Sequence, residues 1–364
     1  MGNDRLILLD VFRGLAVVMM IIVDAPPDFD IIYPILKHSH WEGLTIADFA
    51  FPFFVFAMGM SAALSKNFNL KKILYRTVLL FILGLFFNVL PELLNYFMFN
   101  IEISSDIRIL GVLQRLALTY LFGMFSCYML QSNKKIFIAA FFLLFISSLN
   151  AHIYSTATPF EEMNNINRAI DLEILGQSHL YQSYGFPFDP ENLYGTINSV
   201  ASMLFGFIAC RLITSKIFLG DEVRVFSLFG FTLLIVGYLW SYIDIISKPL
   251  WTAPYVLITS GISYLSLAIL NWLLEKFNLS KIILQPLRAF GMNPLFFYLI
   301  TNFTLILLWT VKFDEVPLYL WLWENTIQGF IDPAFSAMLF AFLWCLIWLP
   351  LAEFLYKLNI IIKV

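Results

Sequence analysis

Two of the four histidines of this chain lie two residues apart, beside carboxylates. His38 and His40 precede Glu42, and Asp48 follows ten residues after His38. A histidine exchanges a proton near neutral pH, so a histidine flanked by carboxylates predicts a general base. The alternative interpretation is a solvated loop histidine. A metal site is a weaker hypothesis, because no third ligand is evident near the His38-x-His40 pair.

Other ionisable groups lie within or at the ends of long apolar segments, where an ion costs about 2.5 to 3.5 kcal/mol on insertion scales. Asp10 and Arg13 adjoin on one helical face, so we predict a structural ion pair between them. Asp24 precedes a Pro-Pro pair that ends the first helix, just before the histidine motif. Asp48 is expected to cap the next helix, where a carboxylate accepts backbone N–H groups.

Three further polar residues interrupt apolar segments. Arg115 requires an acidic partner, for which Asp10 is one option, or an anionic ligand. Asn198 and Asn293 are amides that either join helices by hydrogen bonds or donate to a carbonyl oxygen of a substrate. Both interpretations remain open from the residues alone.

The elements that must position these residues are membrane helices. The 364 residues are 60% hydrophobic and 13% charged, with a mean hydropathy of +0.81, which leaves too few polar side chains to cover a soluble protein. No basic tract indicates nucleic acid, and the three separated cysteines are expected to be packing residues. We predict an all-α, polytopic bundle in a single domain, 1–364, with about ten transmembrane helices near 11–24, 47–65, 73–91, 109–131, 135–152, 194–213, 224–243, 252–274, 293–311 and 335–356.

The distribution of basic residues predicts the orientation of the bundle. Sixteen of the 22 Lys and Arg residues fall on the side of the termini, five fall on the opposite side, and Arg115 lies within a helix. Cytoplasmic loops carry an excess of Lys and Arg, so both termini are predicted to be cytoplasmic. The first apolar segment lacks a small-residue cleavage site and is interpreted as an uncleaved helix.

This orientation places three longer connections outside, at 25–46, 153–193 and 312–334. The connection 153–193 is long for a structureless loop, so it is expected to fold as a lid over the outer mouth. The aromatic segment Val316 to Trp323 is expected to lie at the interface as part of an aromatic belt or as a short helix in the membrane plane.

With these motifs, the sequence resembles the heparan-α-glucosaminide N-acetyltransferase family, and in particular its shorter bacterial members. The resemblance extends along most of the chain. It is carried by Arg5-Leu6, Asp10, Phe12-Arg13-Gly14, Lys37-His38, Trp41, Gly43-Leu44-Thr45, Ala47-Asp48, Phe51-Pro52, Arg108-Ile109, Gly111 to Leu116, Arg168, Ile170-Asp171, Leu175-Gly176, His179-Leu180-Tyr181, Asp189-Pro190-Glu191, Gly195 to Ser199, Leu250-Trp251 and Gly291-Met292-Asn293.

The resemblance implies an acyltransferase that takes acetyl-CoA from the cytoplasm and acetylates a glucosamine-type amine outside. The catalytic histidine falls on His38, because it follows Lys37 and lies three residues before Trp41. Asp24 stands where the family often has Asn near the acetyl group; a carboxylate there would either strengthen His38 as a base or disfavour an anionic intermediate. Direct transfer and an acetyl-histidine intermediate both remain open.

The resemblance also suggests roles for further residues. Asn198 and Asn293 are expected to position the thioester or stabilise the oxyanion. Acyl-CoA phosphates are expected to meet Arg13, Arg115, Lys71, Lys72 and Arg288. The sugar is expected to meet Asp48, Asp171, His179, Tyr181, Asp189 and Glu191, although the acidic loop residues are equally explained as solvated charges.

The expected partners are acetyl-CoA as co-substrate, an amino sugar or a short glycan ending in glucosamine, and membrane lipid, with no metal. A symmetric homodimer is the default expectation. The expected location is a bacterial inner membrane. The alternative function is an amino-sugar transporter, which predicts internal repeats or paired broken helices; no convincing repeat relates the two halves of this sequence.

Overall fold

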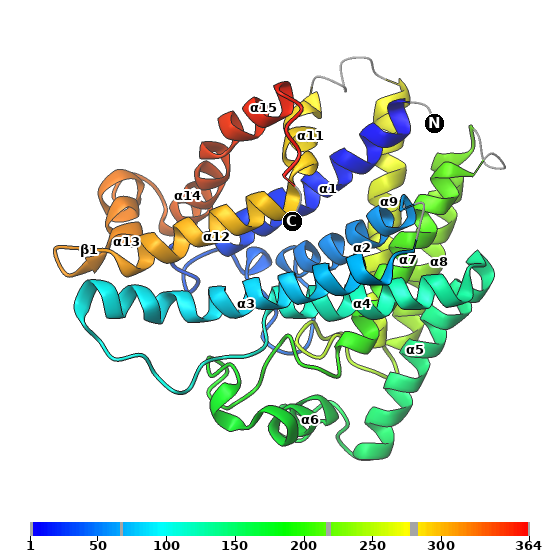
Figure 1. The fold of residues 1–364 in the computed structure, drawn as a ribbon, viewed down its shortest axis with the longest axis horizontal. Helices are drawn as coiled ribbons and strands as arrows, with labels where there is room; N and C mark the ends of the chain where they lie inside the picture. The colour runs from blue at the N-terminus through cyan, green and yellow to red at the C-terminus, as the bar shows by residue number, and fades with distance from the viewer. Residues whose placement is uncertain (1–2, 66–67, 216–219, 277–282, 363–364) are drawn as a thin grey trace.

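A computed structural model describes residues 3–65, 68–215, 220–276 and 283–362. These residues form a helical bundle with one two-stranded hairpin (Figure 1). The longer helices are α1 (Asn3–Asp24), α2 (Ala50–Ala63), α3 (Leu70–Phe99), α4 (Val112–Leu130), α5 (Asn133–Tyr154), α6 (Ile166–Leu175), α7 (Thr196–Thr214), α8 (Glu222–Trp240), α9 (Ala253–Lys276), α11 (Gln285–Met292), α12 (Pro294–Thr310), α14 (Pro333–Ile347) and α15 (Leu349–Lys357).

Short elements join these helices. The 3-10 helices are η1 (Pro34–Leu36), η2 (Ala47–Phe49) and η3 (Gln177–His179). Strands β1 (Lys312–Phe313) and β2 (Val316–Pro317) pair antiparallel before α13 (Leu318–Trp323) and the π-helical η4 (Glu324–Gln328). The aromatic segment after residue 316 therefore contains a short helix, as one of the two interpretations predicted.

Each of the ten predicted segments contains a helix, but the number of membrane crossings is not confirmed. Six helices of the described part are long and apolar enough to cross a membrane: α3, α5, α7, α8, α9 and the α14–α15 stretch. A seventh span results if α11 and α12, which meet at 86°, are counted together. Ten spans and the cytoplasmic position of the termini stay predictions.

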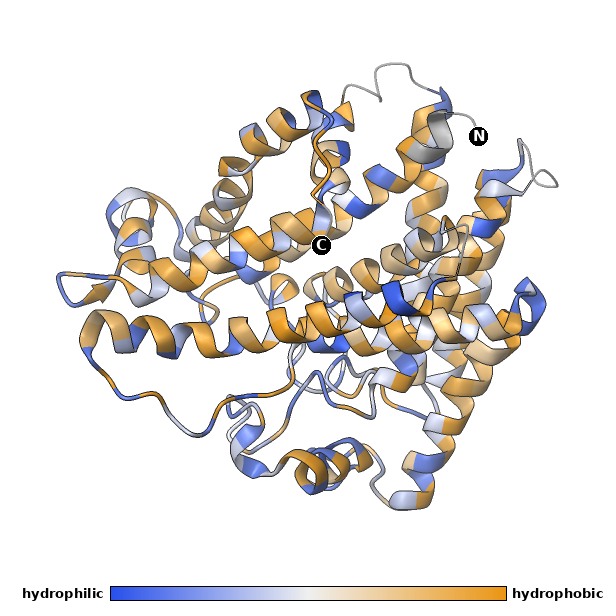
Figure 2. Ribbon diagram, viewed as in Figure 1, coloured by the Kyte–Doolittle hydropathy of each residue, from blue (hydrophilic) through white to orange (hydrophobic). Residues whose placement is uncertain are grey.

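The outer faces of several helices are apolar, as a lipid environment requires. Leu74, Val78, Ile82 and Phe86 are all exposed and follow one another at four-residue intervals on α3. Figure 2 shows hydrophobic residues along α3, α5 and α8, and more hydrophilic residues in the segments that join the helices. An exposed apolar stripe of this length is typical of a surface that contacts lipid.

Close helix packing in the centre depends on small residues. A Cβ atom on Gly14 of α1 would lie 1.7 Å from the carbonyl oxygen of Leu287 in α11, and one on Gly206 of α7 would lie 2.0 Å from that of Phe56 in α2. No larger side chain fits at either position. Small residues at such crossings are typical of membrane bundles, where close van der Waals packing drives association. The three cysteines are free and buried, as predicted.

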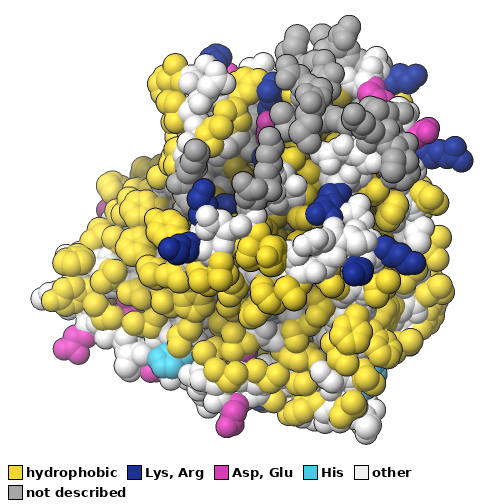
Figure 3. Space-filling model, turned by 45° about the vertical axis from the view of Figure 1, so that its right-hand side comes forward, with side chains coloured by type: hydrophobic (Ala, Val, Ile, Leu, Met, Phe, Trp, Pro, Cys, Tyr) yellow, Lys and Arg dark blue, Asp and Glu magenta, His cyan; other side chains and the backbone are white. Residues whose placement is uncertain are grey.

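The bundle has two chemically different ends. The amino-terminal end of α1 and the carboxy-terminal end of α9 lie together, away from α6 (Figure 1). We call the first the basic end, since α3 begins there with Lys71, Lys72 and Arg76, and the other, which carries α6, the loop end. Figure 3 shows Lys and Arg on the upper and central part of one face and histidine in its lower half. Of the basic residues counted for orientation, Lys66, Lys216, Lys281 and Lys363 lie outside the described residues.

Candidate active site

A cavity of about 280 Å³ lies at the loop end, where α1 ends and α2 and α4 begin. Its lining includes Asp24 and His38, both predicted site residues. The loop 177–193 contributes Tyr181, Tyr184 and Glu191 to the lining, while its action as a lid stays a prediction. The structure thus brings together side chains from four distant parts of the sequence.

A buried carboxylate holds the His38 ring. Nδ1 of His38 lies 2.9 Å from Oδ1 of Asp48, whose side chain is fully buried. The other oxygen, Oδ2, accepts hydrogen bonds from the Ser39 and Thr45 backbone N–H groups and from the Thr45 hydroxyl. When Nδ1–H donates to Asp48, the free lone pair of the imidazole is on Nε2. In this tautomer the ring therefore accepts a proton on Nε2.

The expectation that Asp48 caps a helix is wrong. Neither η2 nor α2 has a side-chain hydrogen bond at its N-cap. The backbone groups that Asp48 binds belong to the preceding loop, at Ser39 and Thr45. Asp48 is buried among the loop donors, so it positions His38 and does not line the cavity as a sugar contact.

Lys248 is a cavity residue to which the sequence analysis assigned no role. Its Nζ lies 2.9 Å from His38 Nδ1 and 3.9 Å from Asp48 Oδ1, and its side chain is 16% exposed. Burial lowers the pKa of the Lys248 ammonium from its ordinary value, while the Asp48, Glu191 and Asp24 carboxylates oppose this shift. Nδ1 carries one hydrogen at most when the ring is neutral, so it cannot both donate to Asp48 and accept from Lys248.

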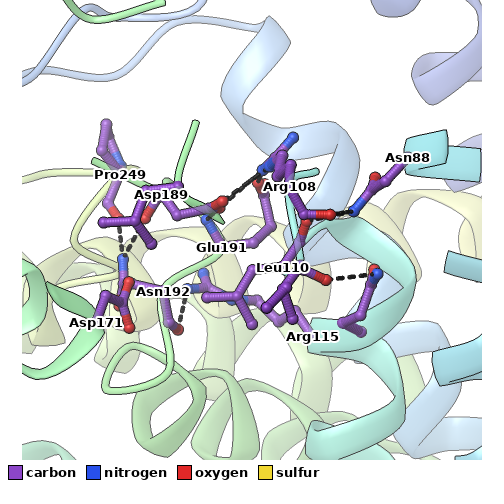
Figure 4. A network of polar contacts seen from close by, with 12 residues as sticks. Asn88, Arg108, Leu110, Arg115, Asp171, Asp189, Glu191, Asn192 and Pro249 are labelled. Carbon is purple, nitrogen blue, oxygen red and sulfur yellow. Dashed lines mark hydrogen bonds and ion pairs between the residues drawn. The ribbon is translucent and has the colours of Figure 1, made fainter. Parts of the chain in front are cut away.

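Arg108 connects the loop over the cavity to the start of α4. Its Nε and Nη2 donate to the two oxygens of Asp189 at 2.8 and 2.7 Å, and Nη2 also donates to Glu191 at 2.6 Å (Figure 4). Its guanidinium lies 4.7 Å from the centre of the Tyr181 ring. Burial alone would lower the pKa of Arg108, but the bonds and charges of its two carboxylates outweigh burial and raise it. These charge-assisted contacts fix the position of Tyr181 and Glu191 at the cavity.

A second buried network lies beneath the same loop. Arg115, 1% exposed, donates from Nη2 to the backbone oxygen of Asn192, and its guanidinium lies 4.9 Å from the Trp251 ring (Figure 4). Asp171 of α6 accepts the Leu193 N–H at 3.0 Å. Burial raises the pKa of Asp171 to about 7. The expected Asp10 partner for Arg115 is wrong, since Asp10 binds Arg13.

The remaining predicted contacts lie outside this cavity. His179 binds the Ile107 carbonyl oxygen through Nδ1, and Asn198 donates to the Trp251 carbonyl oxygen. Asn293 binds Ile360 and Ile362 of the carboxy-terminal segment. None of these three side chains, nor Asp171, Asp189 or Arg115, lines the cavity that contains His38.

Two further cavities continue towards the basic end. One, of about 110 Å³, is lined by Arg13, Ser61 and Arg76, and Arg13 makes the predicted ion pair with Asp10 at 3.1 Å. The next, of about 450 Å³, contains Lys72 and Asn293 and shares Arg76, Pro294 and Leu295 with the first. Among the other predicted phosphate contacts, Lys71 is exposed at the start of α3, and Arg288 donates to the Tyr356 hydroxyl.

Comparisons with known proteins find one family to which this chain is similar. Residues 5–169 match the family model described as heparan-alpha-glucosaminide N-acetyltransferase, catalytic. The sequence is 28% identical to heparan-alpha-glucosaminide N-acetyltransferase of Mus musculus over 73% of this chain and 49% of that protein. The protein of that name from Homo sapiens is also 28% identical, over 73% of this chain and 48% of the relative. These matches support a relation between this chain and the heparan-α-glucosaminide N-acetyltransferase family. It spans about half the length of the curated relatives it matches.

The family model covers only part of the cavity. His38, Asp48 and Arg108 fall within its range, whereas Glu191 and Lys248 lie beyond it. The sequence analysis gave no role to Arg76, Arg108, Tyr184 or Lys248. Arg108 and Lys248 are two of the five basic residues on the predicted outer side. Because basic residues are rare on that side, their position could have marked both as candidate site residues. No cluster of three or more His, Cys, Asp or Glu side chains suited to a metal occurs within the described ranges.

Proposed function

We propose that this protein is a transmembrane N-acetyltransferase that moves an acetyl group from cytoplasmic acetyl-CoA to the amine of a glucosamine-type sugar at the outer face of a bacterial inner membrane. The observation that carries the proposal is the His38 imidazole, held through Nδ1 by a buried carboxylate in an open cavity. A base needs a free nitrogen of fixed orientation within reach of the substrate. The His38 side chain is 37% exposed and lines the cavity, which supports Nε2 as that nitrogen.

The chemistry follows from this tautomer. Nε2 of His38 accepts a proton as the free amine attacks the thioester carbonyl carbon and the C–N bond forms. The C–S bond then breaks, and the leaving sulfur takes the proton back from His38. The products are an amide and a thiol, so atoms and charge balance. Asp48 stays ionised throughout and stabilises the imidazolium that forms between the two steps.

The succession of cavities supports entry of acetyl-CoA from the basic end. Phe54 and Leu116 line the middle cavity, and Ala50 and Val112 line the cavity of His38, one helical turn away on α2 and α4 respectively. Lys72, Arg76 and Arg13 supply positive charge along the first two cavities, which suits phosphate groups. We therefore assign Arg76 to the acyl-CoA site in addition to Arg13 and Lys72, and we no longer include Arg115.

The lining of the outer cavity suits a cationic sugar. Tyr181 and Tyr184 offer aromatic faces, and Asp24 and Glu191 offer carboxylates. Aromatic rings pack against the apolar faces of sugars, and carboxylates attract an ammonium group before it loses its proton. Asp24 and Glu191 are accordingly the proposed contacts of the amine as it enters.

The transporter alternative has less support. Transporters built from inverted repeats have broken helices at corresponding positions of both halves. The described residues contain one sharply bent helix pair, α11 with α12. A single break without a counterpart does not favour alternating access.

The test is acetyl transfer by the purified protein in detergent, with labelled acetyl-CoA and glucosamine. We expect N-acetylated sugar from the parent protein and from His40→Ala, whose side chain is 70% exposed. We expect a loss of at least a hundredfold in kcat from His38→Ala, as for removal of a general base. Sugar binding without product from any short acyl-CoA would instead support the transporter.

A further inference from the structure

Lys248 is the strongest unassigned feature of the cavity. It lies between α8 and α9, 210 residues from His38 in sequence, yet its Nζ is 2.9 Å from the ring of that residue. A cation beside a general base weakens that base, because it disfavours the protonated form. A lysine at this position therefore requires a compensating role.

The segment that carries Lys248 is held firmly. Asn192 donates to the Pro249 carbonyl oxygen at 2.8 Å (Figure 4). Asn167 donates to the carbonyl oxygen of Leu250 at 3.2 Å. These bonds tie the residues that follow Lys248 to the buried network under the loop. The backbone that carries the ammonium group is thus held in place, which favours electrostatic stabilisation of a transition state.

The other charged groups of the cavity indicate a role for the Lys248 ammonium group. Arg108 is committed through Nε and Nη2 to Asp189 and Glu191. Lys248 has three N–H donors, and its 2.9 Å contact with His38 uses one of them at most, since Asp48 Oδ1, at 3.9 Å, lies beyond hydrogen-bond distance. Attack by an amine on a thioester places negative charge on the carbonyl oxygen in a cavity that also contains the Asp24 and Glu191 carboxylates. That charge needs a nearby cation.

We propose that Lys248 is a catalytic residue whose ammonium group stabilises the oxyanion formed when an amine attacks the acyl carbonyl beside His38. This inference rests on the proposed acetyltransferase function. As the C–N bond forms, the carbonyl π electrons move to oxygen and the amine proton moves to Nε2. When the carbonyl re-forms, the thiolate leaves and takes that proton. The role replaces the one expected for Asn198 and Asn293, whose side chains bind backbone groups elsewhere.

The test uses neutral and cationic side chains at position 248. We expect Lys248→Met to lose about 10²- to 10³-fold in kcat, the usual effect of removing one oxyanion donor. KM for acetyl-CoA and for the amine should change less than about threefold, since the interaction forms mainly in the transition state. Retention of more than a third of the parental kcat by Lys248→Met would overturn the proposal.

A second variant separates charge from structure within one preparation. Lys248→Cys is treated with aminoethyl methanethiosulfonate, which rebuilds a cation, or with the ethyl reagent, which adds the same bulk without charge. The three native cysteines are buried, so the parent protein treated in parallel controls for reaction elsewhere. We expect aminoethylation alone to raise kcat at least tenfold. Equal recovery with both reagents, or recovery with neither, would refute a role for the charge.

The two proposals fail differently. If the parent protein makes no N-acetyl product, the acetyltransferase function fails and the role of Lys248 fails with it. If the parent protein is active and the variants at position 248 behave as neutral replacements, only the role of Lys248 fails.

Discussion

Replacement of Asp48 by asparagine tests whether the buried carboxylate fixes the tautomer of His38. Three donors face Oδ2, from Ser39 and from Thr45, at 3.2, 3.0 and 3.1 Å. In Asp48→Asn the amide oxygen must take that position, because an NH₂ group there would face donors only. The NH₂ group then points at His38 Nδ1, which has to accept. The ring proton moves to Nε2, and the base loses its lone pair.

The size of the effect follows from this geometry. Loss of general base catalysis lowers the rate about 10²- to 10⁴-fold, or about 2.7 to 5.4 kcal/mol in the barrier at roughly 1.36 kcal/mol per tenfold. The three loop bonds survive and one charge-assisted bond becomes neutral, so stability should fall by only about 1 kcal/mol. KM should hold, because Asp48 is fully buried and does not line the cavity.

The assay is steady-state acetyl transfer with both substrates varied, alongside the melting temperature in detergent. Thr45→Val is the matched control, because it removes the hydroxyl that contacts Oδ2 and the Lys37 carbonyl oxygen, while Oδ1 keeps its contact with the His38 ring. We expect it to retain at least a tenth of kcat. The reasoning is refuted if Asp48→Asn keeps more than a tenth of the parental kcat, or if Thr45→Val loses as much as Asp48→Asn.

Three further predictions concern stability, measured by unfolding in detergent. Arg108→Met leaves the fully buried Asp189 without its ion-pair partner and should lower the free energy of unfolding by about 3 to 5 kcal/mol. A decrease under about 1 kcal/mol would contradict a stabilising role for the Arg108–Asp189 pair. The folded-state pKa of Asp171, about 7 against an ordinary 3.8, means that the folded state binds a proton more tightly than the unfolded state, so stability should fall as pH rises from about 4 to 7. Asp171→Asn keeps an acceptor for the Leu193 N–H and should remove this pH dependence, which amounts to at most about 4 kcal/mol of unfolding free energy. If the variant loses stability with rising pH as steeply as the parent protein, the raised pKa of Asp171 is not the cause. Gly206→Ala places a Cβ 2.0 Å from a carbonyl oxygen of α2 and should cost about 1 to 3 kcal/mol, whereas Gly329→Ala, with nothing within 4 Å, should stay within about 0.5 kcal/mol of the parent protein.

Local features of the sequence were sufficient for several elements of this protein. Helix positions follow from apolar segments of membrane length, because backbone groups in lipid must bond within their own segment. The Asp10–Arg13 pair follows from helical spacing alone. His38 and His40 are singled out by the carboxylates near them, and the family resemblance selected His38, whose catalytic role stays a prediction. The bend between α11 and α12, by contrast, depends on how the helices pack, and the sequence predicted only the second of the two helices, at 293–311.

Only the tertiary structure decided which polar residues share a cavity. Asp48 looked like a helix cap, yet its acceptors face a loop that folds back over it. Lys248 reaches His38 across 210 residues of sequence because the α8–α9 connection is bound to the loop that follows α6. Asn198 and Asn293 have amide donors suited to an oxyanion, but these donors bind the backbone oxygens of Trp251 and Ile360. Residue type and spacing specify the local chemistry of this chain, whereas contacts between distant loops depend on the packing of all the helices that carry them.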